Sequence, residues 1–321
     1  MMQSSVLCLG EMLWDCLADQ PDRSEPEVVS WTPYPGGAPA NVACALARLG
    51  TPSAFVGCLG TDEDGEKLKH VLEQNGVDTQ GVQRNDLPTR KVYVTRTSAG
   101  ERHFASFGGR AHDGFADTCL KAEHLSEAQF EQAEFLAFGT LMMAFPDSAR
   151  AIEHALGLAD TAYVKILLDV NWRPVFWAEP EQAAPVVLKL IERVDVLKIA
   201  DEEAVWLGLP TVASLLERFD HLEGVFLTRG ARGCVWQVGS NQGEHPGFSV
   251  PSVDTTGAGD AFVAALLHQL GHLPVSAWME HASQVVEYAS AAGALSTLKA
   301  GAIASAPTDP EVQAFLKAQS Q

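Results

Sequence analysis

The sequence predicts an α/β fold in which helices cover both faces of a doubly wound, mostly parallel β-sheet. Short apolar runs of strand length alternate with longer runs of helical periodicity along most of the 321 residues. Several strand-like runs, such as KILLDV and VFLT, are apolar at nearly every position, which is typical of strands covered on both faces. No repeat and no Pro/Gly/Ser-rich linker interrupts the chain, so we expect one continuous domain over residues 1–321.

The amino-terminal part begins with a strand–helix–strand unit. Residues 6–10 (VLCLG) and 53–60 (SAFVGCLG) predict strands, and residues 39–50 between them predict a helix. Pro39 suits the first turn of that helix, and Gly50 suits a left-handed C-cap. This order is that of one unit of a parallel sheet.

The rest of the sheet follows the same alternation. Residues 65–76 predict a helix that ends at an Asn-Gly pair, and apolar strands follow at 165–170, 194–200 and 225–228. Residues 233–238 (GCVWQV) predict one more strand, which pairs as a hairpin with the strand before it.

Two segments, 12–34 and 91–112, do not fit a strand–helix–strand unit. Alternating residues in KVYVTRTSAGERHFASF predict a half-exposed hairpin over 91–107 that turns at Ala99-Gly100. We interpret the two segments as a small β-sheet that projects from the main body and serves as a lid. Surface hairpins without a function are the alternative.

Composition restricts the partners and the location. The chain has 22 basic and 41 acidic residues and a formal charge of −19, whereas nucleic acids and anionic membranes bind basic surfaces, so we expect neither as a partner. The six cysteines stand singly, without metal-ligand spacing, and predict reduced thiols in a cytoplasmic protein. The first residues lack the basic start of a signal peptide, and no window is as apolar as a membrane span, which agrees with that location.

The stretch DTTGAGDAF, residues 254–262, is a candidate for catalysis. A glycine-rich turn that enters a helix points several backbone N–H groups in one direction, at the positive end of the helix dipole, and so forms an anion site. Asp260 falls in or beside the first turn of the helix predicted at 260–270. It could cap that helix, but Thr255 or Thr256 could do so instead. Beside an anion site, a carboxylate can accept the proton of a hydroxyl that attacks a bound phosphoryl group.

The stretch GGAPANVA, residues 36–43, is a second candidate. Gly36 and Gly37 let the backbone approach a small ligand closely, and Asn41, in the first turns of the next helix, can donate to and accept from hydroxyls. A tight turn with a satisfied asparagine is the alternative. Other nucleotide motifs are weaker, because GTDEDGEK places Glu66 where a P-loop needs lysine and no G-x-G-x-x-G follows the first strand.

These two stretches resemble the two signatures of the PfkB (ribokinase-like) carbohydrate kinases, in the expected order along the chain. The similarity continues through VGCLGTDEDG, LLDVNWRPVFW, VFLTRGARG and AAGALSTLKAGAIASAPT, so it covers essentially the whole chain. GEMLWD, GGAPAN and DVNWRPVFW look most like the fructokinase branch. The resemblance implies a ribokinase-like fold and ATP-dependent phosphorylation of a sugar, with fructose to fructose 6-phosphate as the expected reaction.

The resemblance also implies roles for single residues. Asp260 would be the base that deprotonates the sugar hydroxyl, and the backbone of Gly257, Ala258 and Gly259 would form the anion hole for the transferred phosphoryl group. The sugar would be bound by Asp15, Gly36, Gly37, Asn41 and, from the lid segment GERHF, by Arg102 and Phe104. Arg173 would lie near phosphate or substrate, with Asp169 and Asn171 at the same strand end. The nucleotide site would be lined by Thr228, Gly230 and Gly233 and flanked by the helix at 291–296.

Two metal ions are implied as well. ATP brings negative charge into an acidic protein, so we expect Mg²⁺ to accompany it. Related kinases organise Mg²⁺ through water with an Asn-x-x-Glu motif, but KIADEEAVWL has Ala200 where asparagine or serine is expected and keeps Glu203. Either Asp201 or Glu202 compensates, or the magnesium affinity is lower. A monovalent cation such as K⁺ is also implied, with Asp254 and Thr256 at the first half of its site.

Other functions stay open on the sequence. A kinase of another sugar or of a sugar acid, such as 2-keto-3-deoxygluconate, would place a cation at the acid group, which Lys91, Arg102 or Arg110 could supply. Ala200 leaves open a fructokinase-like protein with weak catalysis that acts as a partner or scaffold, although Asp260 weighs against it. The resemblance also permits a homodimer that forms through the lid.

Overall fold

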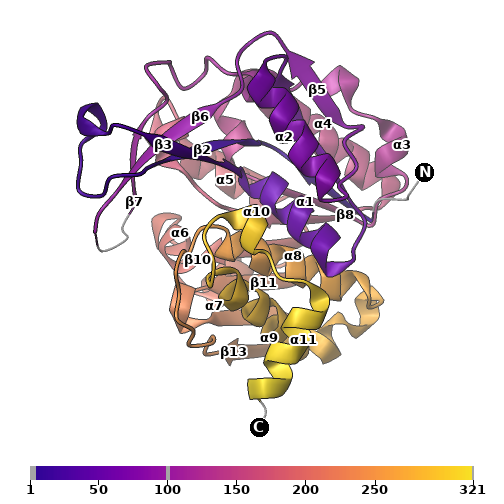
Figure 1. The fold of residues 1–321 in the computed structure, drawn as a ribbon. Coiled ribbons are helices and arrows are strands. Elements are labelled where there is room, and N and C mark those ends of the chain that lie inside the picture. The colour runs from indigo at the N-terminus through magenta and orange to yellow at the C-terminus, as the bar shows by residue number, and fades with distance from the viewer. Residues whose placement is uncertain (1–4, 99–101, 320–321) are drawn as a thin grey trace.

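The computed structural model describes residues 5–98 and 102–319, and a nine-stranded sheet runs through its centre (Figure 1). Its strands are β1 Val6–Leu9, β4 Ser53–Gly60, β5 Val82–Asn85, β8 Phe135–Gly139, β9 Lys165–Asp169, β10 Val196–Ala200, β11 Gly224–Thr228, β12 Cys234–Val238 and β13 Asn241–His245. Their order is β13-β12-β11-β10-β9-β8-β1-β4-β5. The strands from β11 to β5 pair in parallel. At one edge β12 pairs antiparallel with β11, which confirms the predicted hairpin, and β13 pairs antiparallel with β12.

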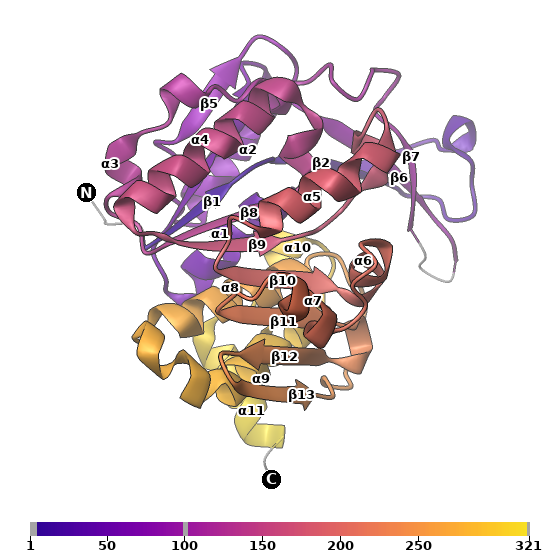
Figure 2. The same ribbon diagram turned by 180° about the vertical axis from the view of Figure 1, so that it is seen from behind.

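Helices cover both faces of this sheet, as the sequence predicts (Figure 2). They are α1 Ala38–Leu49, α2 Glu63–Gln74, α3 Glu127–Phe130, α4 Pro146–Ala162, α5 Ala183–Ile191, α6 Asp201–Trp206, α7 Val212–Arg218, α8 Ala258–Gly271, α9 Trp278–Ser296, α10 Ala302–Ser305 and α11 Asp309–Gln319. Alternate residues of a strand face opposite sides of a sheet. In β1, Val6 and Cys8 pack with α1, α8 and α9, whereas Leu7 and Leu9 pack with α4 and α5. Burial on both faces explains why the strands are apolar at nearly every position.

The predicted strands and helices of the main body are present, and most of their ends differ by at most two residues. The helix predicted at 291–296 is the last part of α9, which begins at Trp278. α2 begins two residues earlier than predicted, because the Asp62 side chain accepts a hydrogen bond from the Gly65 N–H (2.8 Å) and caps the helix. α8 also begins two residues earlier than predicted, so Ala258 and Gly259 belong to its first turn and not to the preceding loop.

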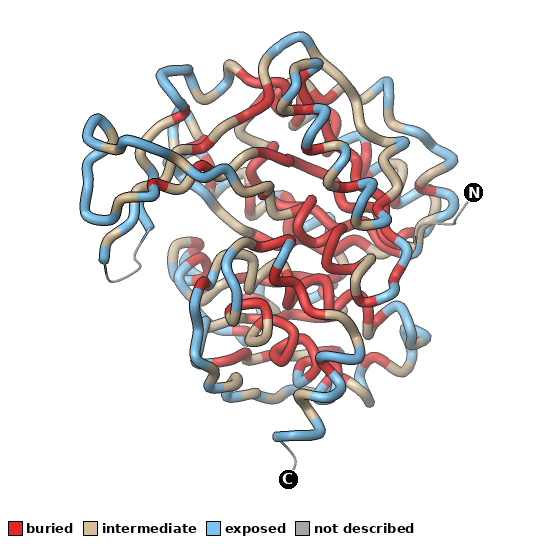
Figure 3. Tube along the Cα trace, viewed as in Figure 1, coloured by how far each residue is buried: buried red, intermediate tan, exposed pale blue. Residues whose placement is uncertain are grey.

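A four-stranded sheet projects from the side of the main body (Figure 1). Its strands are β2 Leu13–Ala18, β3 Trp31–Gly36, β6 Lys91–Arg96 and β7 Arg102–Ser106, in the order β3-β2-β6-β7. β2 and β6 are parallel, and the outer pairs are antiparallel. Most of its residues are half-buried or exposed (Figure 3). It unites the two segments predicted at 12–34 and 91–112, and we call it the lid; the predicted turn at Ala99-Gly100 lies outside the described residues.

The cysteines are free thiols, and all are buried except Cys119, which is partly exposed. Burial raises the pKa of the Cys44 and Cys58 thiols to about 12, so both stay protonated and unreactive. Within the two described stretches of chain, no helix combines the length and the apolar character that crossing a bilayer requires.

A buried ion pair fixes the base of the lid. Arg90 precedes β6 by one residue and is 1% exposed; it donates two hydrogen bonds to the Asp117 carboxylate (2.5 and 2.7 Å) and one to the His112 carbonyl (2.8 Å). Four aromatic rings lie 4.4 to 5.3 Å from its guanidinium carbon, those of Phe107, Phe115, Phe145 and Phe176. Since Phe107 directly follows β7, the lid hairpin starts at this cluster with β6 and returns to it at the end of β7.

We predict that Arg90→Met lowers the free energy of unfolding by about 3–5 kcal/mol, because it leaves the Asp117 carboxylate buried without a counter-charge. Urea denaturation followed by tryptophan fluorescence measures the change. As a control, Arg84→Met removes a more exposed ion pair with Glu66 (2.6 Å) and should cost less than about 1 kcal/mol. A loss for Arg90→Met as small as that of the control would show that the buried pair does not hold the fold.

Candidate functional site

The predicted site residues gather at one edge of the nine-stranded sheet. Parallel strands end at the same edge, so the segments that follow β1, β9, β10 and β11 lie on one side of the molecule. These segments are residues 11–15, 169–173, 200–203 and 228–233. The amino-terminal ends of α1 and α8 meet there too, because Asn41 of α1 contacts Asp260 of α8.

Asp260 is the third residue of α8, and Asn41 holds its carboxylate. The Asn41 Nδ2 group donates a hydrogen bond to Asp260 Oδ2 (2.8 Å). Burial raises the pKa of Asp260 to about 6, against the effect of that hydrogen bond. Among the neighbouring charges, Asp169 also raises this pKa, and Lys198 and Arg173 lower it. A carboxylate with a pKa near neutrality suits general-base chemistry.

The other end of the Asn41 amide is buried and unpaired in the described part of the chain. Asn41 is 6% exposed, and its Oδ1 atom has no hydrogen-bond partner among the described residues. A buried carbonyl oxygen without a donor costs free energy, which a bound hydroxyl would recover. Asn41 can therefore bind a hydroxyl and orient the Asp260 carboxylate at the same time.

Several backbone N–H groups lie close together in the first turn of α8. Gly257 is the N-cap and has a φ of 79°, in the left-handed region that favours glycine. The Ala258 N–H already donates to the carbonyl of Thr255 (3.2 Å). The N–H groups of Gly259 and Asp260 follow, and helix geometry leaves them without an intrahelical acceptor, at the positive end of the dipole. We call residues 257–260 the anion hole.

Lys198 adjoins the anion hole and is not among the predicted site residues. It is 6% exposed, and its Nζ atom lies 2.9 Å from Asp169 Oδ1. A Cβ atom on Gly259 would lie 3.3 Å from the same Nζ, which places the ammonium beside the helix start. Burial alone would lower the pKa of Lys198, but Asp169 and Glu203 outweigh burial and raise it, so the side chain stays charged. The sequence does carry a signal, since a lysine inside the apolar strand VLKIA needs a buried counter-charge.

Glu203 is buried next to Lys198, and both of its carboxylate oxygens accept backbone N–H groups. Trp172 N donates to Oε1 (2.8 Å) and Ala200 N to Oε2 (2.9 Å). Burial raises the pKa of Glu203, and Lys198 opposes this shift. Asp201, next to Ala200, pairs with an exposed arginine.

A magnesium ion that arrives with ATP fits these residues, but a metal site made of protein ligands does not. Within residues 5–98 and 102–319, no group of three His, Cys, Asp or Glu side chains could hold a metal ion. Mg²⁺ commonly keeps several waters and takes its other ligands from phosphates and one or two carboxylates. The remaining lone pairs of Glu203 can accept such a water, whereas Ala200 adds no ligand.

The lid and the main body enclose a polar cavity of about 140 Å³, which we call the cleft. Asp15 and Arg102 line it from the lid, and Asp254 and Thr256 line it from the body. Burial raises the pKa of Asp15 to about 6, Arg102 lowers it, and Asp260 raises it further, so the Asp15 and Asp260 carboxyl groups lie near each other. The remaining lining residues are Leu17, Tyr34, Pro35, Arg96, Val253, Ala300, Gly301 and Ala302.

Gly36 and Gly37 join the lid to α1. A side chain at Gly36 would collide with the Asp15 carboxylate, and one at Gly37 would collide with the backbone of residue 11. Gly37 also has a φ of 104°, which other residues rarely adopt. Gly36 therefore allows Asp15 to approach the start of α1, and Gly37 allows the backbone of residue 11 to do so.

The two lid residues predicted to bind sugar make contacts with protein groups. Arg102 Nη2 lies 2.7 Å from Asp254 Oδ2, so its guanidinium holds a carboxylate of the predicted cation site. Phe104 lies outside the described lining of the cleft and packs on Phe107, with ring centroids 4.9 Å apart.

Two other basic residues behave differently. Arg173 is exposed, and its charge lowers the pKa of both Asp15 and Asp260, so it lies near the two carboxylates. Lys91 lies outside the described lining of the cleft and pairs with Asp64 of α2 (2.6 Å).

The predicted nucleotide residues Thr228, Gly230 and Gly233 lie at or just beyond the end of β11. Thr228 is paired with Ala200 across the parallel strands β10 and β11, and the loop with Gly230 and Gly233 follows. The last turns of α9 pack on the start of α8, since a Cβ atom on Gly293 would lie 3.1 Å from the Ala258 carbonyl oxygen. The end of the helix predicted to flank the nucleotide therefore lies beside the start of α8, and the loop with Gly230 and Gly233 follows β11 at the same edge of the sheet.

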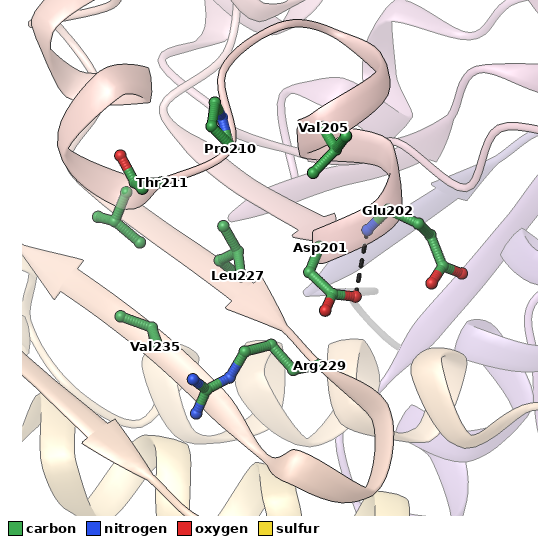
Figure 4. Close-up of a pocket in the computed structure, with 9 residues that line it drawn as sticks. Asp201, Glu202, Val205, Pro210, Thr211, Leu227, Arg229 and Val235 are labelled. Atoms are coloured by element: carbon green, nitrogen blue, oxygen red, sulfur yellow. Dashed lines mark hydrogen bonds between the residues drawn. The ribbon is translucent and has the colours of Figure 1, made fainter.

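A cavity of about 560 Å³ lies between helices α6 and α7 and strands β11 and β12 (Figure 4). Its walls are mainly apolar, and the predicted catalytic, sugar-binding and nucleotide-binding residues are not among its described lining. Asp201 and Glu202, the carboxylates considered as substitutes at the magnesium position, do line it. It is lined by Asp201, Glu202, Val205, Pro210, Thr211, Val212, Leu227, Arg229 and Val235. The buried ion pair of Lys198 with Asp169 and the unpaired Oδ1 atom of Asn41 lie instead at the polar site at the sheet edge. We therefore regard that site, and not the larger cavity, as the candidate functional site.

Comparisons with known proteins identify the family. A family profile described as pfkB family carbohydrate kinase matches residues 3–309. The chain is 35% identical over 320 residues to the probable fructokinase-2 of Arabidopsis thaliana, a match that covers 98% of this chain and 96% of that protein.

Two solved structures share the fold. The fructokinase of Xylella fastidiosa with bound ATP has a TM-score of 0.89 and 30% identity, and the match covers 100% of both chains. A double mutant of the Vibrio cholerae O395 fructokinase, solved with fructose, ADP and a potassium ion, has a TM-score of 0.84 and 28% identity over 98% of both chains. The ribokinase-like fold expected from the resemblance is confirmed, and the chain belongs to the pfkB family of carbohydrate kinases.

Proposed function

We propose that this chain is a fructokinase, which transfers the γ-phosphoryl group of ATP to the 6-hydroxyl of fructose. The observation that carries the proposal is the Asn41–Asp260 contact beside the anion hole. One amide orients a buried carboxylate whose pKa is about 6 and keeps an unpaired oxygen for a hydroxyl. Similarity to fructokinases solved with ATP, or with fructose and ADP, supports the choice of substrates.

The mechanism follows from the positions of these groups. Asp260 would take the proton of the sugar hydroxyl while the oxygen attacks the γ-phosphorus and ADP leaves. Asp15 and Asn41 would hold the sugar, with Gly36 and Gly37 giving it room. The amides of the anion hole, together with Lys198, would stabilise the negative charge on the transferred group. Mg²⁺ bound to ATP would neutralise further charge, held through water by Glu203.

The proposal also covers the nucleotide contacts and a monovalent cation. The segment with Thr228, Gly230 and Gly233 would contact the nucleotide, and Arg173 its phosphates. A monovalent cation beside Asp254 and Thr256 would take most of its ligands from backbone carbonyls, because the Asp254 carboxylate already accepts donors from Thr256, Gly301 and Arg102. Dimerisation through the lid stays a prediction.

A sugar panel tests the substrate. We predict that ADP release shows kcat/KM at least about tenfold higher with fructose than with ribose or 2-keto-3-deoxygluconate, because a site built to hydrogen-bond particular hydroxyls rejects analogues that lack them. A preference for the sugar acid would contradict the proposal and would assign a cation of the cleft, such as Arg102, to its carboxylate. If no sugar of the panel causes ADP release, the result would favour a scaffold protein.

A substitution tests the base. Asp260→Asn should lower kcat by about 10²- to 10⁴-fold, the usual contribution of a general base, while calorimetry still detects binding of fructose and ATP. The control is Asp147→Asn, which changes a first-turn aspartate of α4 outside the site and should leave kcat within about twofold. Near-normal turnover of Asp260→Asn would remove Asp260 from the role of base.

The pH profile tests the charge balance. Only ionised Asp260 can accept a proton, so kcat/KM should rise as the pH increases through about 6. Lys198 lowers the pKa of Asp260, so Lys198→Met should move this rise to higher pH, whereas Lys198→Arg should leave it in place. Ionisation of the substrates is common to all variants and cancels in the comparison. Identical midpoints in all three proteins would show that Lys198 does not act on the titrating group.

A further inference from the structure

One ion pair joins the lid to the segment that leads into the anion hole. Arg102 is the first residue of β7, and its Nη2 atom lies 2.7 Å from Oδ2 of Asp254. The Asp254 side chain is 5% exposed and that of Arg102 is 31% exposed, so the pair is partly shielded from water. A second lid–body ion pair, between Lys91 and Asp64 (2.6 Å), joins the lid to α2 instead.

Asp254 organises the backbone from which the anion hole is built. Its Oδ1 atom accepts the Thr256 N–H (3.0 Å), and its Oδ2 atom accepts the Gly301 N–H (3.0 Å). Ala302, which follows Gly301, lies so close to Gly257 that a side chain at Gly257 would collide with it. The Asp254 carboxylate therefore ties together the two backbone segments that meet at the N-cap of α8.

We infer that Arg102 is a positioning residue that makes the geometry of the anion hole depend on the position of the lid. When the lid lies over the cleft, the guanidinium neutralises and holds the Asp254 carboxylate, and this carboxylate fixes the segment that ends at Gly257. When the lid moves away, Asp254 keeps its two amide donors but loses its cation. The inference rests on the proposed function, because it concerns the place where the phosphoryl group is proposed to bind.

The arrangement links sugar binding to the phosphate site. Asp15 and Arg102 both belong to the lid and both line the cleft, so a sugar in the cleft touches the element that carries Arg102. A hydrogen bond between charged partners is roughly twice as strong as a neutral one, so its loss matters at a carboxylate as buried as Asp254. The anion hole would then be complete only when sugar holds the lid in place, which disfavours transfer of the phosphoryl group to water.

Hydrogen exchange on the full chain without substrates tests the link directly. In Arg102→Met, the amides of Thr256 and Gly301 should exchange at least about tenfold faster than in the wild type, because both donate to the Asp254 carboxylate. Lys91→Met breaks the other lid–body ion pair and should leave these two amides within about twofold of the wild type. Unchanged exchange of both amides in Arg102→Met would overturn the inference.

Kinetics with fructose and ATP separate positioning from direct sugar binding. Arg102→Met and Asp254→Asn should each lower kcat by about tenfold, and the double variant should be no slower than either single one, because the two residues act as a unit. Arg102→Lys keeps the positive charge and should restore kcat to within about threefold of the wild type. If Arg102→Met alone raises KM for fructose and leaves kcat unchanged, Arg102 binds the sugar directly and the inference is wrong.

The inference and the proposed function fail in different ways. If the wild type phosphorylates no sugar but Arg102→Met still loosens the Thr256 and Gly301 amides, the function fails and the link stands. If the wild type phosphorylates fructose but the two amides do not change, the function stands and the link fails. Arg102 is partly exposed, so Arg102→Met carries the test even if Asp254→Asn does not fold.

Discussion

The buried guanidinium of Arg90 is the constraint on which the lid and the site depend. A cation removed from water needs a counter-charge and acceptors for its N–H groups, which Asp117 and the His112 carbonyl supply. Its aromatic neighbours come from distant segments, since Phe107 directly follows the lid and Phe176 lies three residues beyond Arg173. One cluster therefore fixes both the place where the lid strands leave the body and the loop that brings Arg173 to the sheet edge.

The chemistry of the site is decided by a local charge balance within an acidic protein. The chain carries a net charge of −19, and burial raises the pKa of both Asp15 and Asp260 to about 6. Lys198 opposes this trend from inside the sheet, where it is held by Asp169. Because carboxylates crowd the site, a phosphate must be met by backbone amides and a few fixed cations, and the amino terminus of α8 supplies the amides. Burial, with a smaller effect from the Asp169 carboxylate, keeps Asp260 basic enough to accept a proton.

The lid contributes both polarity and charge to the cleft. Asp15 lies on β2 and Arg102 on β7, two strands apart in the lid sheet, and both line the same cavity. The base of the lid is buried at Arg90, and most of the sheet beyond it is half-buried or exposed. A change in lid position would therefore alter the environment of the sugar and of the Asp254 carboxylate together.

The sequence by itself determined the fold class, the strands and helices, and the two stretches around Asn41 and Asp260. Apolar periodicity and a glycine-rich turn before a helix are local properties, so they can be read along the chain. Only the tertiary structure decided that Asn41 donates to Asp260 across 219 positions, that Lys198 lies beside the anion hole, and that Arg102 pairs with Asp254. The partner of a buried charge depends on how distant segments of the chain pack together. No local sequence pattern reports this packing, so these contacts could not be predicted from the sequence.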